Sequence, residues 1–172
     1  LGSIEHQLYP APFVNAGFAY EDSGAGRALP HHTDSDTFRR RLWNATMNGQ
    51  YPTFGNSGTA GEKTIAVDAK YADSPGAKAM TAWFDFFSRT RHWELEPYFD
   101  VDGGRCVALE GVEYIVYVEK PGPVEIAVEK HGYNVAWFNP QTGESLKQKD
   151  WKGERYMGEP PDKTRDWVLH IS

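Results

Sequence analysis

The chain has 172 residues, which is enough for one ordinary domain or two small ones. It carries 24 acidic and 18 basic residues, a formal net charge of −6, and because the two signs are interspersed no nucleic-acid partner is expected. No apolar run approaches the roughly 20 residues that cross a bilayer, so no membrane-spanning segment is expected either.

The chain opens with a short strand candidate followed by a helix. Residues 12–16 (PFVNA) are apolar and β-prone, and a loop rich in Gly, Ser and Pro follows them. Apolar residues then recur at helical spacing over residues 35–48. Ser35 or Asp36 is the predicted N-cap of this helix, since a short polar side chain satisfies the first free backbone N–H groups.

A second strand–helix pair follows. Residues 51–55 (YPTFG) form the strand candidate. Ser74 as cap and Pro75 at the first position predict a helix over residues 75–90. Its predicted apolar face consists of Met80, Trp83, Phe84 and Phe87. Strands alternating with helices favour a parallel arrangement with crossover helices.

The pattern changes near residues 93–97, and from Arg105 onward nearly every signal is for a strand. The sequence therefore predicts two domains, residues 1–93 and 94–172. The only cysteine, Cys106, lies in an apolar strand-like run and is expected to be a buried, inert thiol.

Three strand-like runs lie close together in the second domain. Residues 114–118 are aromatic and β-branched throughout, which predicts burial on both faces, whereas residues 124–129 alternate and should have one wet face. Turns at residues 120–123 and at His131–Gly132 would connect these runs to a third, residues 133–138, as a β-meander.

The third run leads into a hairpin signal at residues 139–143 (NPQTG). Pro140 suits a type I turn, and Gly143 suits the left-handed position that follows it. The closing strand is expected within residues 166–172. An antiparallel β-sandwich is the architecture that these runs predict.

The second domain resembles a known module. Residues 114–117 (YIVY), 137–143 (WFNPQTG) and 166–170 (DWVLH) are similar to a C-terminal β-sandwich labelled a collagen-binding domain. In that family the sandwich follows an apiosidase-like glycoside hydrolase barrel. Residues 13–21 (FVNAGFAYE), 41–45 (RLWNA) and 51–55 resemble the final two β/α units of such a barrel.

The resemblance implies an α+β chain: two β/α units from the end of a barrel, then an antiparallel β-sandwich. It implies the C-terminal part of a secreted bacterial carbohydrate-active enzyme. Such an enzyme would be extracellular or periplasmic and would act on a polysaccharide or oligosaccharide without a cofactor. The missing barrel portion, or a second copy of the chain, would be its protein partner.

The sequence departs from the family pattern at the catalytic position. The family motif resembles Asn-x-Glu-Phe-x-Tyr-Glu, and its first Glu would be the strand-end carboxylate. In this chain Gly17 stands there and can transfer no proton. Glycosidases use a pair of carboxylates, about 5 Å apart in retaining enzymes, and the strand expected to carry the partner is absent. The chain alone is therefore predicted to be inactive.

Four residues remain as candidates for a site. Glu21 is the only catalytic candidate, and the alternative is that Glu21 and its neighbour Asp22 are solvated or cap a helix. Asn15, Tyr20 and Trp151 are the candidate substrate-binding residues. Asn15 could instead satisfy a turn, and Trp151, although its neighbours are charged, could instead be a packed edge aromatic.

Histidines and carboxylates also gather near residues 31–36, where His31, His32, Asp34 and Asp36 could hold a metal ion. Tandem histidines do not easily share one ion, and no third spaced histidine is evident, so a polar loop is favoured and no metal site is predicted.

Two functions of different classes stay open. The sandwich is either a structural support packed against a glycosidase barrel or an independent module that binds polysaccharide or a collagen-like protein. A large exposed apolar patch within residues 12–90 would favour the first. A shallow groove lined by aromatic residues on the sandwich would favour the second.

Overall fold

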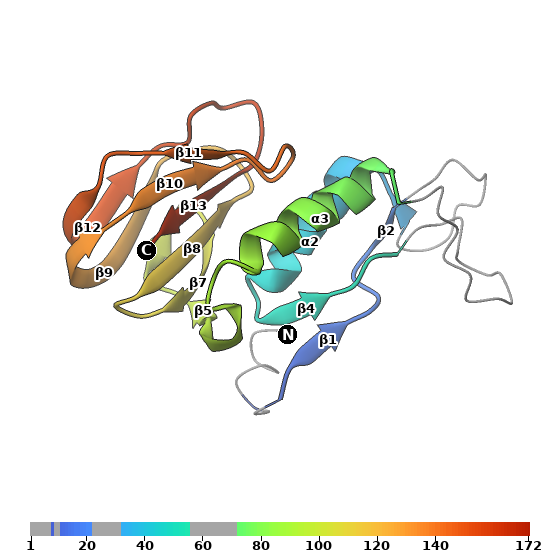
Figure 1. The fold of residues 1–172 in the computed structure, drawn as a ribbon, viewed down its shortest axis with the longest axis horizontal. Helices are drawn as coiled ribbons and strands as arrows, with labels where there is room; N and C mark the ends of the chain where they lie inside the picture. Colours follow the sequence, from blue (N-terminus) through green and yellow to red (C-terminus); the bar gives the residue numbers. More distant parts are fainter. Residues whose placement is uncertain (1–7, 9–10, 22–31, 56–71) are drawn as a thin grey trace, which may run out of the picture.

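The computed structural model describes residues 8, 11–21, 32–55 and 72–172. Figure 1 shows a β-sandwich on the left and a pair of helices with short strands on the right. A three-stranded and a six-stranded sheet face each other, and the helices cover the other face of the six-stranded sheet. The antiparallel β-sandwich predicted from the sequence is therefore confirmed.

The first part of the chain alternates short strands with helices. Strand β1 pairs in parallel with β4, and α2 lies between them in the sequence, as expected for a crossover unit. Strands β2 and β3 form a second, two-residue parallel pair. The elements are β1 (Phe13–Asn15), β2 (Tyr20–Glu21), β3 (His32–Thr33), α2 (Ser35–Thr46), β4 (Gln50–Pro52), α3 (Pro75–Phe87) and the 3-10 helix η2 (His92–Glu94).

The helix starts follow from their capping residues. Asp34, rather than the predicted Ser35 or Asp36, caps α2, because its carboxylate accepts the Thr37 N–H at 2.9 Å and the Thr37 hydroxyl at 2.8 Å. These hydrogen bonds hold the pKa of Asp34 below its usual value. Ser74 caps α3 as predicted, accepting the Ala77 N–H, and Pro75 occupies the first turn.

The buried face of α3 differs from the predicted one at two positions. Trp83 and Phe87 are buried as expected, but Phe86 is buried in place of Phe84, which is 63% exposed, and Ala79 is buried where Met80 is only partly so. The sequence pattern assigned Phe84 to the core because Phe84 lies four residues after Met80, a spacing that also fits the 3.6-residue period of an apolar helix face.

The second part of the chain contains the two sheets. Strands of the six-stranded sheet lie in the order β11-β10-β13-β8-β7-β5, and those of the three-stranded sheet in the order β12-β9-β6. Their bounds are β5 (Glu96–Tyr98), β6 (Val101–Asp102), β7 (Arg105–Leu109), β8 (Glu113–Val118), β9 (Val124–Tyr133), β10 (Val135–Phe138), β11 (Ser145–Lys147), β12 (Trp151–Gly158) and β13 (Trp167–Ile171).

The predicted meander of β8, β9 and β10 is wrong. Strand β9 belongs to the opposite sheet, and β13 pairs with both β8 and β10 between them. His131 and Gly132 do not turn the chain, since β9 continues to Tyr133 and pairs with β12 over that stretch. The chain crosses between the sheets at Asn134, and no local signal distinguishes such a crossing from a hairpin.

The hairpin between β10 and β11 agrees with the prediction. Gly143 has φ +80°, a value that favours glycine, and its N–H donates to the Asn139 carbonyl at 2.9 Å. The Asn139 side chain accepts a hydrogen bond from the N–H of Gln141 at 2.9 Å, and this bond within the turn stabilises its conformation.

Strand β8 is buried along its whole length, as its composition predicted. Tyr114, Val116 and Val118 face the three-stranded sheet and help to form the sandwich core. Cys106 lies in the same core, and burial raises the pKa of its thiol. Ile115 and Tyr117 point the other way, into a second core.

The second core joins the helices to the sheet. It contains Phe38, Leu42 and Trp43 from α2 and three aromatic residues from α3, packed on Ile115, Tyr117, Phe138 and Val168 of the sheet. Trp43 is fully buried at its centre; its ring stacks on that of Tyr117 with centres 5.8 Å apart and makes an edge contact with that of Phe86 at 5.6 Å. The two parts of the chain therefore share a core.

A buried ion pair crosses the same interface. The carboxylate of Asp166, just before β13, accepts hydrogen bonds from Arg39 Nη2 at 2.7 Å and Arg39 Nε at 3.2 Å, and from the Tyr117 hydroxyl at 2.9 Å. Burial and the neighbouring Asp166 charge raise the pKa of Tyr117, so the phenol remains a donor. Asp36 gives Arg39 a second, exposed partner at 2.6 Å.

Neither helix of the described part of the chain combines the length and apolar character needed to cross a membrane.

Replacing Asp166 tests the importance of this interface. Asp166→Ala should lower the free energy of unfolding by about 3–5 kcal/mol, because it leaves the Arg39 guanidinium buried without its principal partner. Asp36→Ala removes the exposed partner of the same guanidinium and should cost no more than about 1 kcal/mol. Urea titrations of both variants measure the difference, and equal losses would contradict the ranking.

Candidate functional site

The carboxyl ends of β1 and β4 are where a β/α enzyme would place its catalytic groups. Asn15, at the end of β1, donates from Nδ2 to Gln50 Oε1 at 2.7 Å and accepts the Gly17 N–H at 3.2 Å. Its side chain thus both bridges the two strands and stabilises the turn that contains Gly17. Gly17 itself is exposed, and a Cβ added there would meet no atom within 4 Å.

Tyr20 lies beyond this turn, at the start of β2. Its hydroxyl donates to the Ala16 carbonyl at 3.3 Å, and its ring packs over Gly55, where a Cβ would come within 2.4 Å of the ring. The side chain is half-buried. Tyr20 therefore packs the segment after β4 against the segment after β1.

Glu21 is 1% exposed and lies at the start of both helices. Its Oε1 accepts the Ser35 hydroxyl at 2.8 Å and the Gly76 N–H at 2.6 Å, and its Oε2 accepts the Ser74 hydroxyl at 2.5 Å. Ser35 opens α2, whereas Ser74 and Gly76 belong to the first turn of α3. A carboxylate at two helix N-termini is favoured by the dipoles of both helices.

The close approach of this carboxylate requires a glycine. A Cβ on Gly76 would lie 2.6 Å from Glu21 Cδ, so a side chain at this position would displace the carboxylate. The contacts give Glu21 a structural role, in which one side chain fixes the relative position of α2 and α3. The catalytic role expected of Glu21 stays a prediction.

Trp151 is separated from the other candidates by the six-stranded sheet. It begins β12 in the three-stranded sheet, and its ring is partly buried against Tyr133, at 6.3 Å, and Tyr156, at 5.5 Å. The most exposed tryptophan among the described residues is instead Trp93, at 65%. The structure thus keeps Asn15, Tyr20 and Glu21 on neighbouring elements and places Trp151 elsewhere.

The candidate metal ligands are only in part within the described residues. His31 lies outside them, as does Asp22, and only the backbone of His32 is described. Asp34 caps α2 and Asp36 pairs with Arg39, so both carboxylates have structural partners. The described residues contain no group of three or more His, Cys, Asp or Glu side chains that could hold a metal ion.

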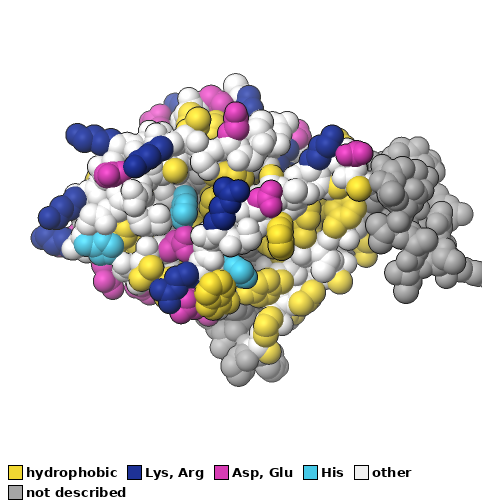
Figure 2. Space-filling model, in the orientation of Figure 1, with side chains coloured by type: hydrophobic (Ala, Val, Ile, Leu, Met, Phe, Trp, Pro, Cys, Tyr) yellow, Lys and Arg dark blue, Asp and Glu magenta, His cyan; other side chains and the backbone are white. Residues whose placement is uncertain are grey.

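An apolar groove opens beside the parallel strands. It has a volume of about 450 Å³ and lies between β4, α3 and η2, with Tyr51, Pro52, Met80, Phe84 and Leu95 among its walls. Val14 on β1 is 60% exposed as well. Figure 2 shows hydrophobic side chains gathered over this side of the molecule, where α3, β4 and β1 lie in Figure 1.

A buried polar pair escaped the sequence analysis. His170 Nε2 lies 2.7 Å from Glu113 Oε1, and Glu113, the first residue of β8, is buried. Its other oxygen accepts the Arg91 N–H at 3.1 Å. The available signal was a charged or ionisable residue in each of two otherwise apolar strands, EYIVYV and WVLHI.

Residues 100–172 match the family model described as "Putative collagen-binding domain of a collagenase". A search of curated proteins gave no match. The resemblance of the sandwich to such a domain is therefore confirmed over residues 100–172.

Solved glycoside hydrolase structures share the fold. One titled "Glycoside hydrolase" aligns with 93% of this chain at 14% identity and a TM-score of 0.71. A glycoside hydrolase family 5 protein and a putative glycoside hydrolase, both from Bacteroides vulgatus ATCC 8482, align with 98% and 99% of it at 13% and 14% identity, with TM-scores of 0.75 and 0.74. The chain spans 42%, 43% and 38% of the three proteins. At such identities the likeness concerns the fold.

The structural role of Glu21 gives a measurable expectation. Glu21→Ala should lower the free energy of unfolding by about 2–4 kcal/mol, because three donors at two helix starts lose a buried acceptor. Glu110→Ala, which removes an exposed carboxylate from the turn before β8, should change it by about 0.5 kcal/mol or less. Denaturant titration compares them, and a negligible effect of Glu21→Ala would refute the role.

Proposed function

We propose that this chain is the C-terminal part of a carbohydrate-active enzyme of the apiosidase-like glycoside hydrolase type. The β/α part would be the last two units of a (β/α) barrel, and the sandwich would support the barrel from outside. The fold shared with glycoside hydrolase structures over two fifths of their length supports this proposal. A polymeric substrate would be met outside the cytoplasm, so the proposal includes secretion.

The exposed apolar side of the β/α part is the observation that carries the proposal. Among the described elements β1 pairs only with β4, so each strand has an open edge. The groove of about 450 Å³ lies beside β4, and its wall residue Phe84 is 63% exposed. In a parallel sheet such edges are normally paired and both faces covered. The remaining strands and helices of a barrel would pair with these edges and cover the apolar groove.

The proposal also accounts for the missing catalytic group. Glycoside hydrolysis needs an acid and a nucleophile or base on either side of one bond. Gly17 occupies the strand-end position of one carboxylate, and Glu21 is held by donors from both helix starts. The complementary carboxylate would come from a strand that pairs with an open edge. The isolated chain is therefore expected to be inactive.

The alternative is an independent module that binds polysaccharide or a collagen-like protein, which the family match over residues 100–172 favours. Two observations support the first proposal over this one. Trp137 and Trp167 are buried in the sandwich core, where no ligand reaches them. The outer face of the six-stranded sheet is covered by α2 and α3, with which it shares a core.

A fluorescent dye tests whether the groove side is an open apolar surface. Anilinonaphthalene sulfonate fluoresces when it binds exposed hydrophobic surface. Phe84→Ser should reduce its fluorescence with the chain severalfold and leave the thermal midpoint unchanged, since the ring is mostly exposed. Phe99→Ser removes a ring that is 71% exposed on the sandwich and is the matched control. An equal reduction by both variants would contradict a specific groove surface.

Hydrolysis assays test the catalytic part. The chain should release no aglycone from aryl glycosides and no reducing ends from plant polysaccharides. Gly17→Glu, which the open surroundings of Gly17 accommodate, should stay folded and equally inactive, because the second carboxylate is still absent. Turnover by the unaltered chain that disappears in a folded Glu21→Gln variant would overturn the proposal and make Glu21 catalytic.

A further inference from the structure

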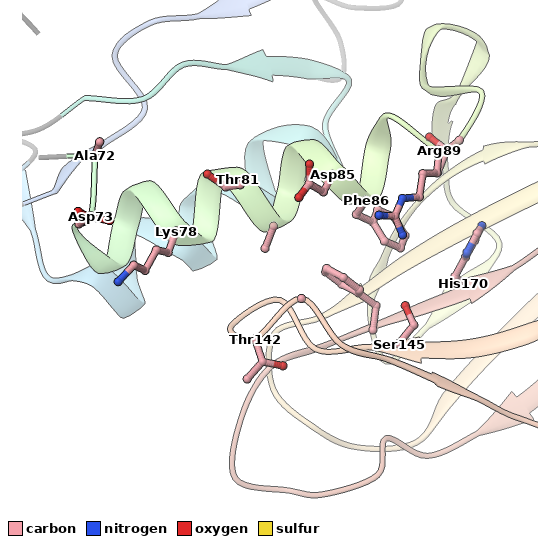
Figure 3. A pocket seen from close by; sticks show the side chains of 14 residues that line it. Ala72, Asp73, Lys78, Thr81, Asp85, Phe86, Arg89, Thr142, Ser145 and His170 are labelled. Carbon is pink, nitrogen blue, oxygen red and sulfur yellow. The ribbon is translucent and has the colours of Figure 1, made fainter. Parts of the chain in front are cut away.

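A second hollow lies on the other side of α3, between this helix and the β10–β11 hairpin (Figure 3). It has a volume of about 550 Å³, which is within the usual range for small-molecule sites. Ala82, Phe86 and Phe138 give it an apolar floor. Arg89, His170 and Ser145 are at one end of it in Figure 3, and Lys78 and Asp73 are at the other. We name it the α3–hairpin cleft.

One buried carboxylate connects the two sides of this cleft. Glu113 accepts from His170 Nε2 on the sheet and from the Arg91 N–H, two residues beyond Arg89. The edge of the His170 ring also contacts Phe86, with ring centres 5.3 Å apart. Burying a carboxylate is costly unless it is hydrogen-bonded, and Glu113 holds the His170 ring at the cleft while its second bond anchors the backbone two residues beyond Arg89. That end is therefore held in place before any ligand arrives.

Five polar side chains of the cleft have no hydrogen-bond or ion-pair partner within the part of the chain that the structure describes. They are Asp73, Lys78, Asp85, Arg89 and Ser145. Asp85, in the last turn of α3, and Arg89, just beyond the end of the helix, are four residues apart and yet form no ion pair. Two carboxylates, at Asp73 and Asp85, and two cations, at Lys78 and Arg89, balance in formal charge.

We propose that the α3–hairpin cleft binds a neutral oligosaccharide. Sugar hydroxyls both donate and accept hydrogen bonds, so they match a wall that offers both cations and carboxylates. Hydrogen bonds to charged groups are stronger than those between neutral groups. The C–H face of a pyranose ring fits the floor of Ala82, Phe86 and Phe138. A strongly charged ligand of either sign would meet like charge along the α3 wall, which carries both carboxylates and cations. The choice of saccharides among neutral polyols rests on the proposed function.

The experiment uses the ¹⁵N-labelled full chain and solution NMR. Cellohexaose, xylohexaose, mannohexaose and galactohexaose are titrated separately to millimolar concentration, with trigalacturonic acid and a triple-helical collagen peptide as competing probes. At least one neutral hexasaccharide should shift the amide signals of Thr142, Gly143 and Ser145 in a saturable way. Arg89→Ala should weaken that binding about tenfold or more, as expected for the loss of a hydrogen bond to a charged group.

Arg91→Ala is the matched control, because Arg91 is near the same end of α3 but outside the cleft, and alanine keeps the backbone N–H that Glu113 uses. The Arg91→Ala variant should bind the neutral hexasaccharide with the same affinity as the unaltered chain. The proposal fails if no neutral hexasaccharide shifts the cleft signals, if both arginine variants bind alike, or if trigalacturonic acid or the collagen peptide binds there more tightly. The dye and hydrolysis tests concern other surfaces. The proposed function can therefore be refuted while the saccharide site is upheld, and the saccharide site can be refuted while the proposed function is upheld.

Discussion

The packing of α2 and α3 on the outer face of the six-stranded sheet is the constraint on which the rest of the structure depends. Trp43 is at the centre of this interface, in contact with rings from α3 and from the sheet, and Arg39 with Asp166 forms a buried ion pair across it. Aromatic packing supplies most of the favourable free energy, whereas the ion pair is directional and fixes which helix position faces which strand. Neither part could rotate on the other without leaving a buried charge unpaired.

This shared core explains how the surfaces of the chain are arranged. Because one face of the helix pair is held by the sheet, the groove beside β4 and the cleft beside the hairpin lie on opposite sides of α3. The two hollows differ in chemistry. The groove is walled mainly by apolar side chains and suits further elements of a fold, whereas the cleft presents balanced charges over an apolar floor and suits a small polar ligand. A sandwich serving only as a tethered module would need no such core with its neighbour.

The helix starts show how a residue typical of an active site can be used for structure. Glu21 is near the carboxyl ends of parallel strands, where catalytic carboxylates are usual, and yet it accepts from Ser35, Ser74 and Gly76 in a buried position. Helix N-termini attract a carboxylate in a binding site and in a purely structural joint for the same electrostatic reason. Residue type and position along a strand do not distinguish a binding carboxylate from a structural one. The groups that donate hydrogen bonds to the carboxylate do distinguish them.

The sequence by itself determined the elements whose signals are local. Ser74 and Pro75 placed the start of α3, the Asn139–Gly143 pattern placed a hairpin, and the unbroken apolar run of β8 predicted burial on both faces. Only the tertiary structure decided that β9 crosses to the other sheet, that Phe86 rather than Phe84 is buried, and that Trp151 is far from Asn15. It alone also paired Arg39 with Asp166 and Glu113 with His170. The physical reason is that capping, turn geometry and strand periodicity are satisfied within a few residues, whereas ion pairs, sheet order and the choice of a buried helix face depend on groups far apart in the chain.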